Sequence, residues 1–201
     1  MDKIHILDSN VSNKIAAGEV VERPASVIKE LVENSIDAGA ASITVEIKNG
    51  GISYMRVTDN GCGMTREDAK VSFIRHATSK IIREDDLNNI KTLGFRGEAL
   101  ASIASVSHVE MSTKLKEETY GSKIIINGGE FESIEDCGCT DGTSIIVRNL
   151  FYNTPARLKF LKTESREGTI VSESLYSLAL SKPSISFKYI KDGKAIFNTP
   201  G

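Results

Sequence analysis

Four polar side chains recur at the spacing of one helical face along residues 24–38: Glu30, Glu33, Asn34 and Asp37. A carboxylate such as that of Glu30 can accept a proton from water. An amide oxygen one helical turn away, on Asn34, can bind a hard cation such as Mg²⁺. An acidic helical face is also commonly just solvated, so the spacing makes Glu30 and Asn34 candidates for chemistry without excluding an ordinary surface.

A second motif, Asp59-x-Gly61-x-Gly63, follows a predicted strand. A carboxylate at a strand end can accept hydrogen bonds along one edge of a planar base, and glycines at 61 and 63 let the backbone approach a ligand closely. The same residues are good turn formers, so a tight turn is the alternative interpretation. Gly142-Thr143, which opens another predicted strand, would add a hydroxyl near the base.

Residues 75–97 are predicted to form one long loop with phosphate-binding groups at both ends. The near end carries Thr78, Ser79 and Lys80, and the far end leads into Gly94-Phe95-Arg96-Gly97-Glu98-Ala99-Leu100. Backbone N–H groups at a helix start, together with a guanidinium, suit a polyphosphate. This order indicates a lid over a ligand; a flexible loop that closes onto a helix cap is the alternative.

The elements that must position these groups are helices mixed with hairpin-connected strands. Helix 24–38 begins at Pro24 and stops at Gly39, and its apolar residues recur at helical spacing. Further helices are predicted over 10–20, 65–74 (capped by Thr65), 97–104 and 165–181, and strands over 42–48, 52–58, 105–114, 121–127, 130–136, 143–150, 186–191 and 194–198. This mixture predicts one α+β domain over 1–201, a two-layer sandwich of a mixed, mostly antiparallel sheet with helices on one face.

Composition and missing motifs exclude several classes. Lys and Arg number 25 against 27 Asp and Glu, and the net charge of −2 excludes a wholly basic nucleic-acid module. The sequence has no long apolar run or signal-peptide core, so no membrane partner is expected. It has neither a Gly-x-x-x-x-Gly-Lys-Ser/Thr phosphate loop nor a Gly-x-Gly-x-x-Gly fingerprint. Three cysteines suit a reducing cytoplasm, and Cys137-Gly138-Cys139 is spaced too closely for zinc.

Four segments together resemble the motifs of the GHKL ATPases, the family with the Bergerat fold that includes gyrase B, the heat-shock chaperone ATPase and sensor histidine kinases. Glu30-x-x-x-Asn34 is similar to the first motif, 59–63 to the second, 94–97 to the third and 142–143 to the fourth. Longer strings resemble the MutL family of DNA mismatch repair proteins over essentially the whole chain; they lie at 13–24, 31–35, 94–100 and 151–157.

The resemblance implies a role for each candidate residue. Glu30 would be the general base for the attacking water, and Asn34 would hold the Mg²⁺ that bridges the phosphates of ATP. Asp59 would accept from the adenine amine, with Thr143 and a water in support, and Gly61 and Gly63 would line the site. The remaining binding residues would surround the phosphates once the lid orders: Thr78, Ser79, Lys80, Gly94, Phe95, Arg96, Gly97, Glu98, Ala99 and Leu100.

The MutL family also implies an ATP-dependent dimer, to which an N-terminal arm over about residues 1–20 contributes. It implies signalling from a mismatch-recognition partner to downstream nuclease and helicase steps, in the cytoplasm and at the nucleoid during repair. MutL proteins continue into a second domain, which supplies a lysine to the γ-phosphate, and a C-terminal dimerisation domain. We expect both domains to lie outside this chain, so the region alone should hydrolyse ATP weakly or not at all.

Three alternatives stay open. Another GHKL ATPase, of topoisomerase or kinase type, would share the short motifs. A nucleotide-gated binding module with little hydrolysis would use ATP to order residues 75–97 and the N-terminal arm. A DNA-binding module, or a weak DNA contact, would use the basic residues between 148 and 166: Arg148, Arg157, Lys159, Lys162 and Arg166.

Overall fold

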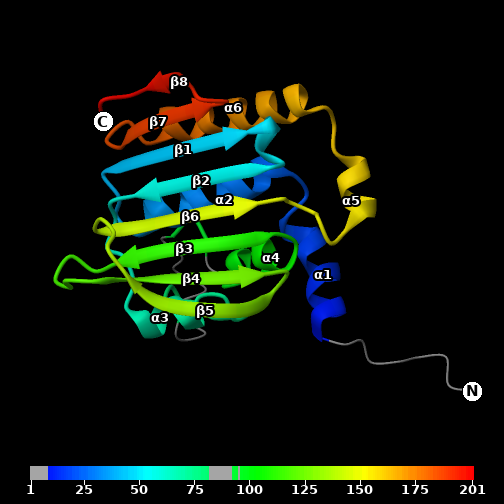
Figure 1. The fold of residues 1–201 in the computed structure, drawn as a ribbon. Helices are drawn as coiled ribbons and strands as arrows, with labels where there is room; N and C mark the ends of the chain where they lie inside the picture. Colours follow the sequence, from blue (N-terminus) through cyan, green and yellow to red (C-terminus); the bar gives the residue numbers. More distant parts are fainter. Residues whose placement is uncertain (1–8, 82–91, 95) are drawn as a thin grey trace, which may run out of the picture.

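The computed structural model describes residues 9–81, 92–94 and 96–201. The strands of this part form one sheet in the order β5-β4-β3-β6-β2-β1-β7-β8, and α2, α4 and α6 lie against one of its faces (Figure 1). The strands are β1 Ser42–Lys48, β2 Tyr54–Asp59, β3 His108–Lys114, β4 Gly121–Asn127, β5 Glu130–Cys137, β6 Gly142–Arg148, β7 Ser186–Lys191 and β8 Lys194–Asn198.

The helices are α1 Ser9–Val20, α2 Pro24–Asp37, α3 Arg66–Val71, α4 Ala99–Ser105, α5 Pro155–Phe160 and α6 Glu164–Ser181, and a short 3₁₀ turn, η1 Asn49–Gly51, links β1 to β2. Within the described part of the chain, none of these helices combines the length and apolar content that a membrane span needs.

Strand pairing confirms the mixed, mostly antiparallel sheet. β1 and β7 run parallel, and the other neighbouring strands pair antiparallel. β6 does not pair with β5, which precedes it in sequence. It lies instead between β3 and β2, and this order sets Thr143 directly opposite Asp59. The strand order therefore joins two sequence motifs that lie far apart along the chain.

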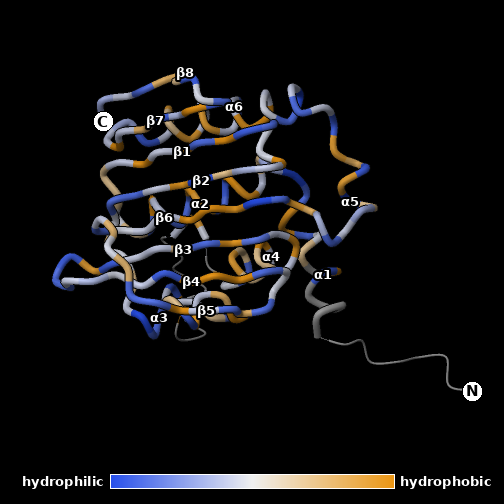
Figure 2. Tube along the Cα trace, in the orientation of Figure 1, coloured by the Kyte–Doolittle hydropathy of each residue, from blue (hydrophilic) through white to orange (hydrophobic). Residues whose placement is uncertain are grey.

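The core lies between the sheet and its helices. Buried and half-buried residues alternate along β1, β2 and β3, as a sheet with one covered face requires. Figure 2 shows this alternation as hydrophobic and hydrophilic steps along the strands. α2 turns Ile28, Leu31 and Val32 into the core. Burying one such side chain fully contributes about 1.5–3 kcal/mol, so this packing fixes which face of α2 stays polar.

Several predicted boundaries were wrong, for local reasons. The helix expected over 97–104 begins only at Ala99, because Gly97 has a φ of 63°, which a helix cannot contain. The following strand begins at His108 rather than 105, and α3 ends at Val71 rather than 74. α5 was not predicted at all. It has six residues and buries none of them, so its sequence carries no periodic signal.

Candidate functional site

Asp59, the last residue of β2, is buried, and three donors hold its carboxylate. Oδ2 accepts the Ser35 hydroxyl of α2 at 2.8 Å. Oδ1 accepts the backbone N–H of Gly61 at 2.9 Å and that of Thr143 at 3.3 Å. Since each donor comes from a different element, the carboxylate has a fixed position and can serve as a rigid hydrogen-bond acceptor.

The hydroxyl of Thr143 lies in a second polar group beside this carboxylate. It hydrogen-bonds the Thr113 hydroxyl of β3 at 2.9 Å. Thr113, which is buried, also approaches the Gly142 carbonyl at 3.1 Å and accepts the Met64 N–H at 3.0 Å. These bonds tie β3, β6 and the loop after β2 together, so the Thr143 hydroxyl has a fixed position beside Asp59.

The loop from Asp59 to Gly63 lies against the end of α2 and the end of β3. The N–H of Cys62 donates to the Ala38 carbonyl at 3.0 Å, and a side chain at Gly61 would meet Ala38 at 2.9 Å. Gly63 has a φ of 70°, and a Cβ there would lie 2.1 Å from the Lys114 carbonyl oxygen. The two glycines are therefore needed for close packing of the loop as well as for any ligand.

The polar stripe of α2 gathers both ends of the segment 75–97. The Lys80 ammonium donates to Asn34 Oδ1 at 2.9 Å and to Asp37 Oδ2 at 2.6 Å. From the other end, the backbone N–H groups of Leu93 and Gly94 donate to the Asp37 carboxylate at 3.0 and 3.2 Å. Lys80 and Gly94, predicted from opposite ends of a loop, thus meet on one helix.

Glu30 lies one turn before Asn34 in a partly desolvated position. Burial is the main cause that raises the pKa of its carboxyl above the ordinary value of 4.5, and the charge of Glu33 raises it further. The cations of Lys29, Lys80 and Arg96 act in the opposite direction. A raised pKa makes the ionised form a better proton acceptor, which suits a general base.

The remaining lid residues lie at the junction with α4. The His76 N–H donates to the Gly97 carbonyl at 2.9 Å, and the imidazole lies 3.4 Å from the Glu98 carboxylate. The Thr78 hydroxyl accepts the Lys80 N–H at 3.1 Å, and Ser79 is exposed. Ala99 and Leu100 begin α4, and Arg96 is exposed beside Gly97. Phe95, residues 82–91 of the predicted lid and residues 1–8 of the predicted arm lie outside the described residues.

The structure thus brings Asn34, Lys80 and Gly94 together, with Glu30 one turn away on the same helix, and it joins α2 to Asp59 through Ser35, the residue after Asn34. Sequence reasoning missed the roles of three residues: Ser35, Asp37 and Thr113. Ser35 carried a signal, because it falls on the buried side of α2, where a hydroxyl needs a partner.

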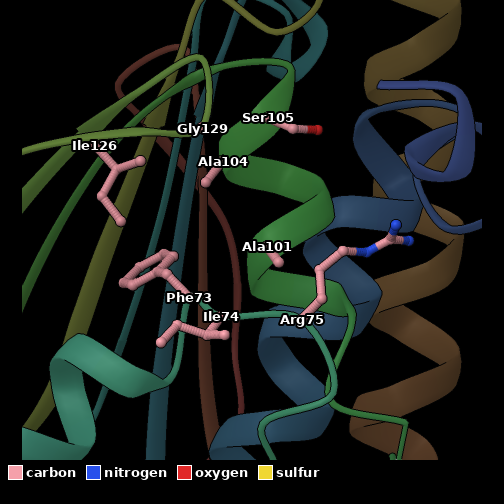
Figure 3. Close-up of a pocket in the computed structure, with 8 residues that line it drawn as sticks. All are labelled: Phe73, Ile74, Arg75, Ala101, Ala104, Ser105, Ile126 and Gly129. Carbon is pink, nitrogen blue, oxygen red and sulfur yellow. The ribbon is translucent and has the colours of Figure 1, made fainter. Parts of the chain in front are cut away.

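Other features lie apart from this site. A cavity of about 360 Å³ lies between the residues after α3, helix α4 and the end of β4; its lining includes Arg75, the first residue of the predicted loop 75–97, but none of the candidate residues named for nucleotide binding (Figure 3). The basic residues expected for DNA are spread out and partly engaged. Arg148 pairs with Glu110 on the open face of the sheet, whereas Arg157 donates to the carbonyls of Lys14 and Ile15 in α1.

Comparison with known proteins extends over the whole chain. The MutL mismatch repair proteins of Caldanaerobacter subterraneus subsp. tengcongensis and Clostridium tetani are 60% and 54% identical to it over 201 residues. The chain spans about a third of their length, 34% and 32% respectively.

A solved structure, the Aquifex aeolicus MutL ATPase domain complexed with ADP, superposes with a TM-score of 0.74 at 34% identity. The match covers 90% of this chain and 64% of that one. The family model for "Histidine kinase-, DNA gyrase B-, and HSP90-like ATPase" matches residues 22–136, more than half of the sequence. The chain therefore belongs to the histidine kinase-, DNA gyrase B- and HSP90-like ATPase family, in its MutL branch.

Proposed function

We propose that this chain is the ATP-binding and ATP-hydrolysing region of a MutL-type DNA mismatch repair protein. The observation that carries the proposal is the 2.8 Å hydrogen bond from Ser35 to Asp59, because it sets a buried acceptor beside the helix that bears Glu30 and Asn34. The likeness to an ATPase domain whose structure contains ADP supports the same assignment.

Asp59 would recognise the base. Its two oxygens already receive one hydroxyl and two backbone N–H groups, and the lone pair that remains on Oδ2 can accept from the exocyclic amine of adenine. Guanine presents a carbonyl oxygen at that position, so two acceptors would face each other. The site should therefore prefer ATP to GTP, because a buried polar group left without its partner costs about 1–3 kcal/mol.

Asn34 would hold Mg²⁺ with the phosphates. Its Oδ1 faces the Lys80 ammonium, so this oxygen already lies where a cation is favoured. Among the residues that the structure describes, no three His, Cys, Asp or Glu side chains form a metal cluster. One amide oxygen with phosphate oxygens and water is a ligand set that Mg²⁺ accepts. When bound, Mg²⁺ supplies charge neutralisation for the transferred phosphoryl group.

Glu30 would accept the proton of the attacking water. It lies on the same helical face as Asn34, one turn away, and burial raises its pKa. Lys80, Gly94 and the backbone from Arg96 to Leu100 would surround the phosphates, with Thr78 and Ser79 at the near end of the loop. Positioning and charge would then supply most of the catalysis, as is usual for phosphoryl transfer.

Nucleotide binding would also act as a switch. Lys80 and Gly94 are both bonded to Asp37, so a triphosphate that engages them would change how these two residues lie on α2. We infer that this change supports dimerisation of the longer protein, with the arm over residues 1–20 contributing. In this proposal the dimer passes a signal from a mismatch-recognition protein to nuclease and helicase steps in the cytoplasm, at the nucleoid.

Three variants test the proposal. Glu30→Ala should keep ATP binding and lose hydrolysis, whereas Asn34→Ala should lose the Mg²⁺-dependent part of binding. Glu33→Ala, on the same stripe and 3.8 Å from the Lys29 ammonium, is the matched control: it removes a neighbouring charge but no proposed ligand contact, and should keep both binding and hydrolysis. Binding is measured by calorimetry with and without Mg²⁺.

Hydrolysis is measured on a chain that continues beyond residue 201, as its relatives do. Equal turnover in wild type and Glu30→Ala would contradict the role of Glu30.

A further inference from the structure

Two thiols outside the nucleotide site gather at one position of the sheet. Cys137 ends β5 and lies directly opposite Gly121 of β4. Cys139 folds back over the same glycine, because a Cβ at Gly121 would lie only 2.3 Å from its sulfur. The missing side chain at Gly121 therefore makes room for the second sulfur beside the first.

The two thiols interact with each other. Burial, the neighbouring Cys137 sulfur and a hydrogen bond with it raise the pKa of the Cys139 thiol to about 11. Cys139 therefore keeps its proton, and its S–H can donate to Cys137. The Lys114 ammonium acts to lower this pKa, and the Asp141 carboxylate with which it pairs acts to raise it, so the two charges oppose each other. The pair is therefore defined by the two neighbouring sulfurs, with Cys139 as the protonated partner.

We propose that Cys137 and Cys139 form a redox site that closes an intramolecular disulfide by exchange with a small-molecule disulfide. Both cysteines are free and only partly buried, so a small reagent can reach them. Within the described residues no third His, Cys, Asp or Glu joins them as a metal ligand, and the proposed ATP chemistry uses neither sulfur. A disulfide that forms in a reducing compartment is typically transient and either catalytic or redox-sensing.

The exchange balances in two steps. The Cys137 thiolate attacks one sulfur of the small disulfide; that S–S bond breaks, and half of the reagent leaves as a thiolate. The Cys139 sulfur loses its proton to solvent and attacks the Cys137 sulfur of the mixed disulfide, which forms the internal S–S bond and expels the second half. Two electrons pass to the reagent, which ends as two thiols.

The site lies beside Thr113, which hydrogen-bonds Thr143, itself a backbone donor to Asp59. A Cβ at Gly121 would also contact the Thr113 carbonyl oxygen, at 2.7 Å. The hydroxyl of Thr113 bonds that of Thr143, and the next carbonyl, that of Lys114, packs against Gly63. Closing the disulfide would therefore disturb the base site. This second consequence rests on the proposed function, whereas the redox chemistry does not.

Redox titration of the 201-residue chain tests the chemistry directly. The chain is equilibrated in buffers of oxidised and reduced glutathione, and its free thiols are alkylated. It is then digested, and the masses of the peptides are measured by mass spectrometry. The peptide with Cys137 and Cys139 should lose both alkylation sites together without forming a dimer, and Cys62→Ser should not change this. Cys137→Ser and Cys139→Ser should each abolish the internal disulfide. The folded chain should keep the internal disulfide at an about tenfold higher ratio of reduced to oxidised glutathione than the chain unfolded in urea, because the fold holds the two sulfurs side by side. Independent alkylation of the two cysteines, or the same midpoint ratio in the folded and unfolded chains, would overturn the proposal.

Nucleotide affinity tests the second consequence. The oxidised chain should bind a non-hydrolysable ATP analogue at least threefold more weakly than the reduced chain, and Cys139→Ser should bind equally under both conditions. Equal affinity of the oxidised and reduced wild-type chains would contradict the coupling. A reduced chain that binds no nucleotide would contradict the proposed function instead, and the mass measurement separates the two failures.

Discussion

Replacing Asp37 should release Leu93 and Gly94, near the far end of the segment 75–97, from α2, whereas Lys80 keeps its bond to Asn34. Its side chain is 7% exposed and accepts three donors: the Lys80 ammonium at 2.6 Å and the N–H groups of Leu93 and Gly94 at 3.0 and 3.2 Å. Hydrogen bonds to a charged group are worth about 1.5–3 kcal/mol each. In Asp37→Ala, the two backbone amides lose their acceptor completely.

Amide hydrogen exchange measures this loss residue by residue. A change of about 1.4 kcal/mol alters an opening equilibrium tenfold, so exchange at Leu93 and Gly94 should accelerate about 10- to 100-fold in Asp37→Ala. Global stability should fall by less, because a carboxylate in the last turn of a helix opposes the helix dipole and its removal relieves that cost.

Glu33→Ala is the matched control for this experiment. Glu33 lies on the same stripe, but its pairing with Lys29 is long, at 3.8 Å, and Lys29 is 56% exposed. Exchange at Leu93 and Gly94 should stay within twofold of wild type in this variant. Unchanged protection in Asp37→Ala, or an equal increase in Glu33→Ala, would refute the conclusion that Asp37 holds this segment.

Further predictions concern stability and binding. Because folding raises the pKa of Glu30, the folded state binds its proton more tightly, and stability falls as pH rises from the ordinary value of 4.5 through the raised one. Glu30→Gln should therefore melt at a higher temperature than wild type at pH 7; a lower Tm would contradict this. Ser35→Ala should weaken ATP binding about fivefold by calorimetry, since one hydrogen bond to Asp59 contributes about 1 kcal/mol; unchanged affinity would count against it. Gly97→Ala should lower the free energy of unfolding, measured by urea denaturation, by about 1 kcal/mol or more, because φ at this position is 63° and the added Cβ would lie 2.4 Å from the Ala77 carbonyl oxygen. A loss below about 0.3 kcal/mol would contradict this prediction.

Local sequence patterns were sufficient to predict α2 and the end of β2. The polar and apolar stripes of α2 follow from residue spacing alone, and Asp59 stands where alternation ends and glycines begin. The Thr65 cap was also predicted, and its hydroxyl accepts the Asp68 N–H at 3.1 Å. These features depend on neighbours within a few residues, and so they are visible in the sequence.

Non-local pairing was not predictable in the same way. Nothing near Thr143 indicates that β6 pairs with β2, yet this pairing sets Thr143 opposite Asp59. The importance of Asp37 depends likewise on Leu93 and Gly94, which lie more than fifty residues later in the chain. Only the motif resemblance joined these segments before the structure did, and it did not indicate Ser35 or Thr113 as partners.

Asp59 is proposed to recognise an adenine base beside Asn34 and Glu30. Calorimetric titration of Mg²⁺-ATP and Mg²⁺-GTP into the wild-type and Asp59→Asn chains tests this role most directly. Asp136→Asn, which changes an exposed aspartate, is the control. Wild type and control should bind ATP at least tenfold more tightly than GTP, and Asp59→Asn should lose that preference while keeping its circular dichroism spectrum. Equal affinities for both nucleotides in wild type, or undiminished ATP binding by a folded Asp59→Asn chain, would contradict the claim.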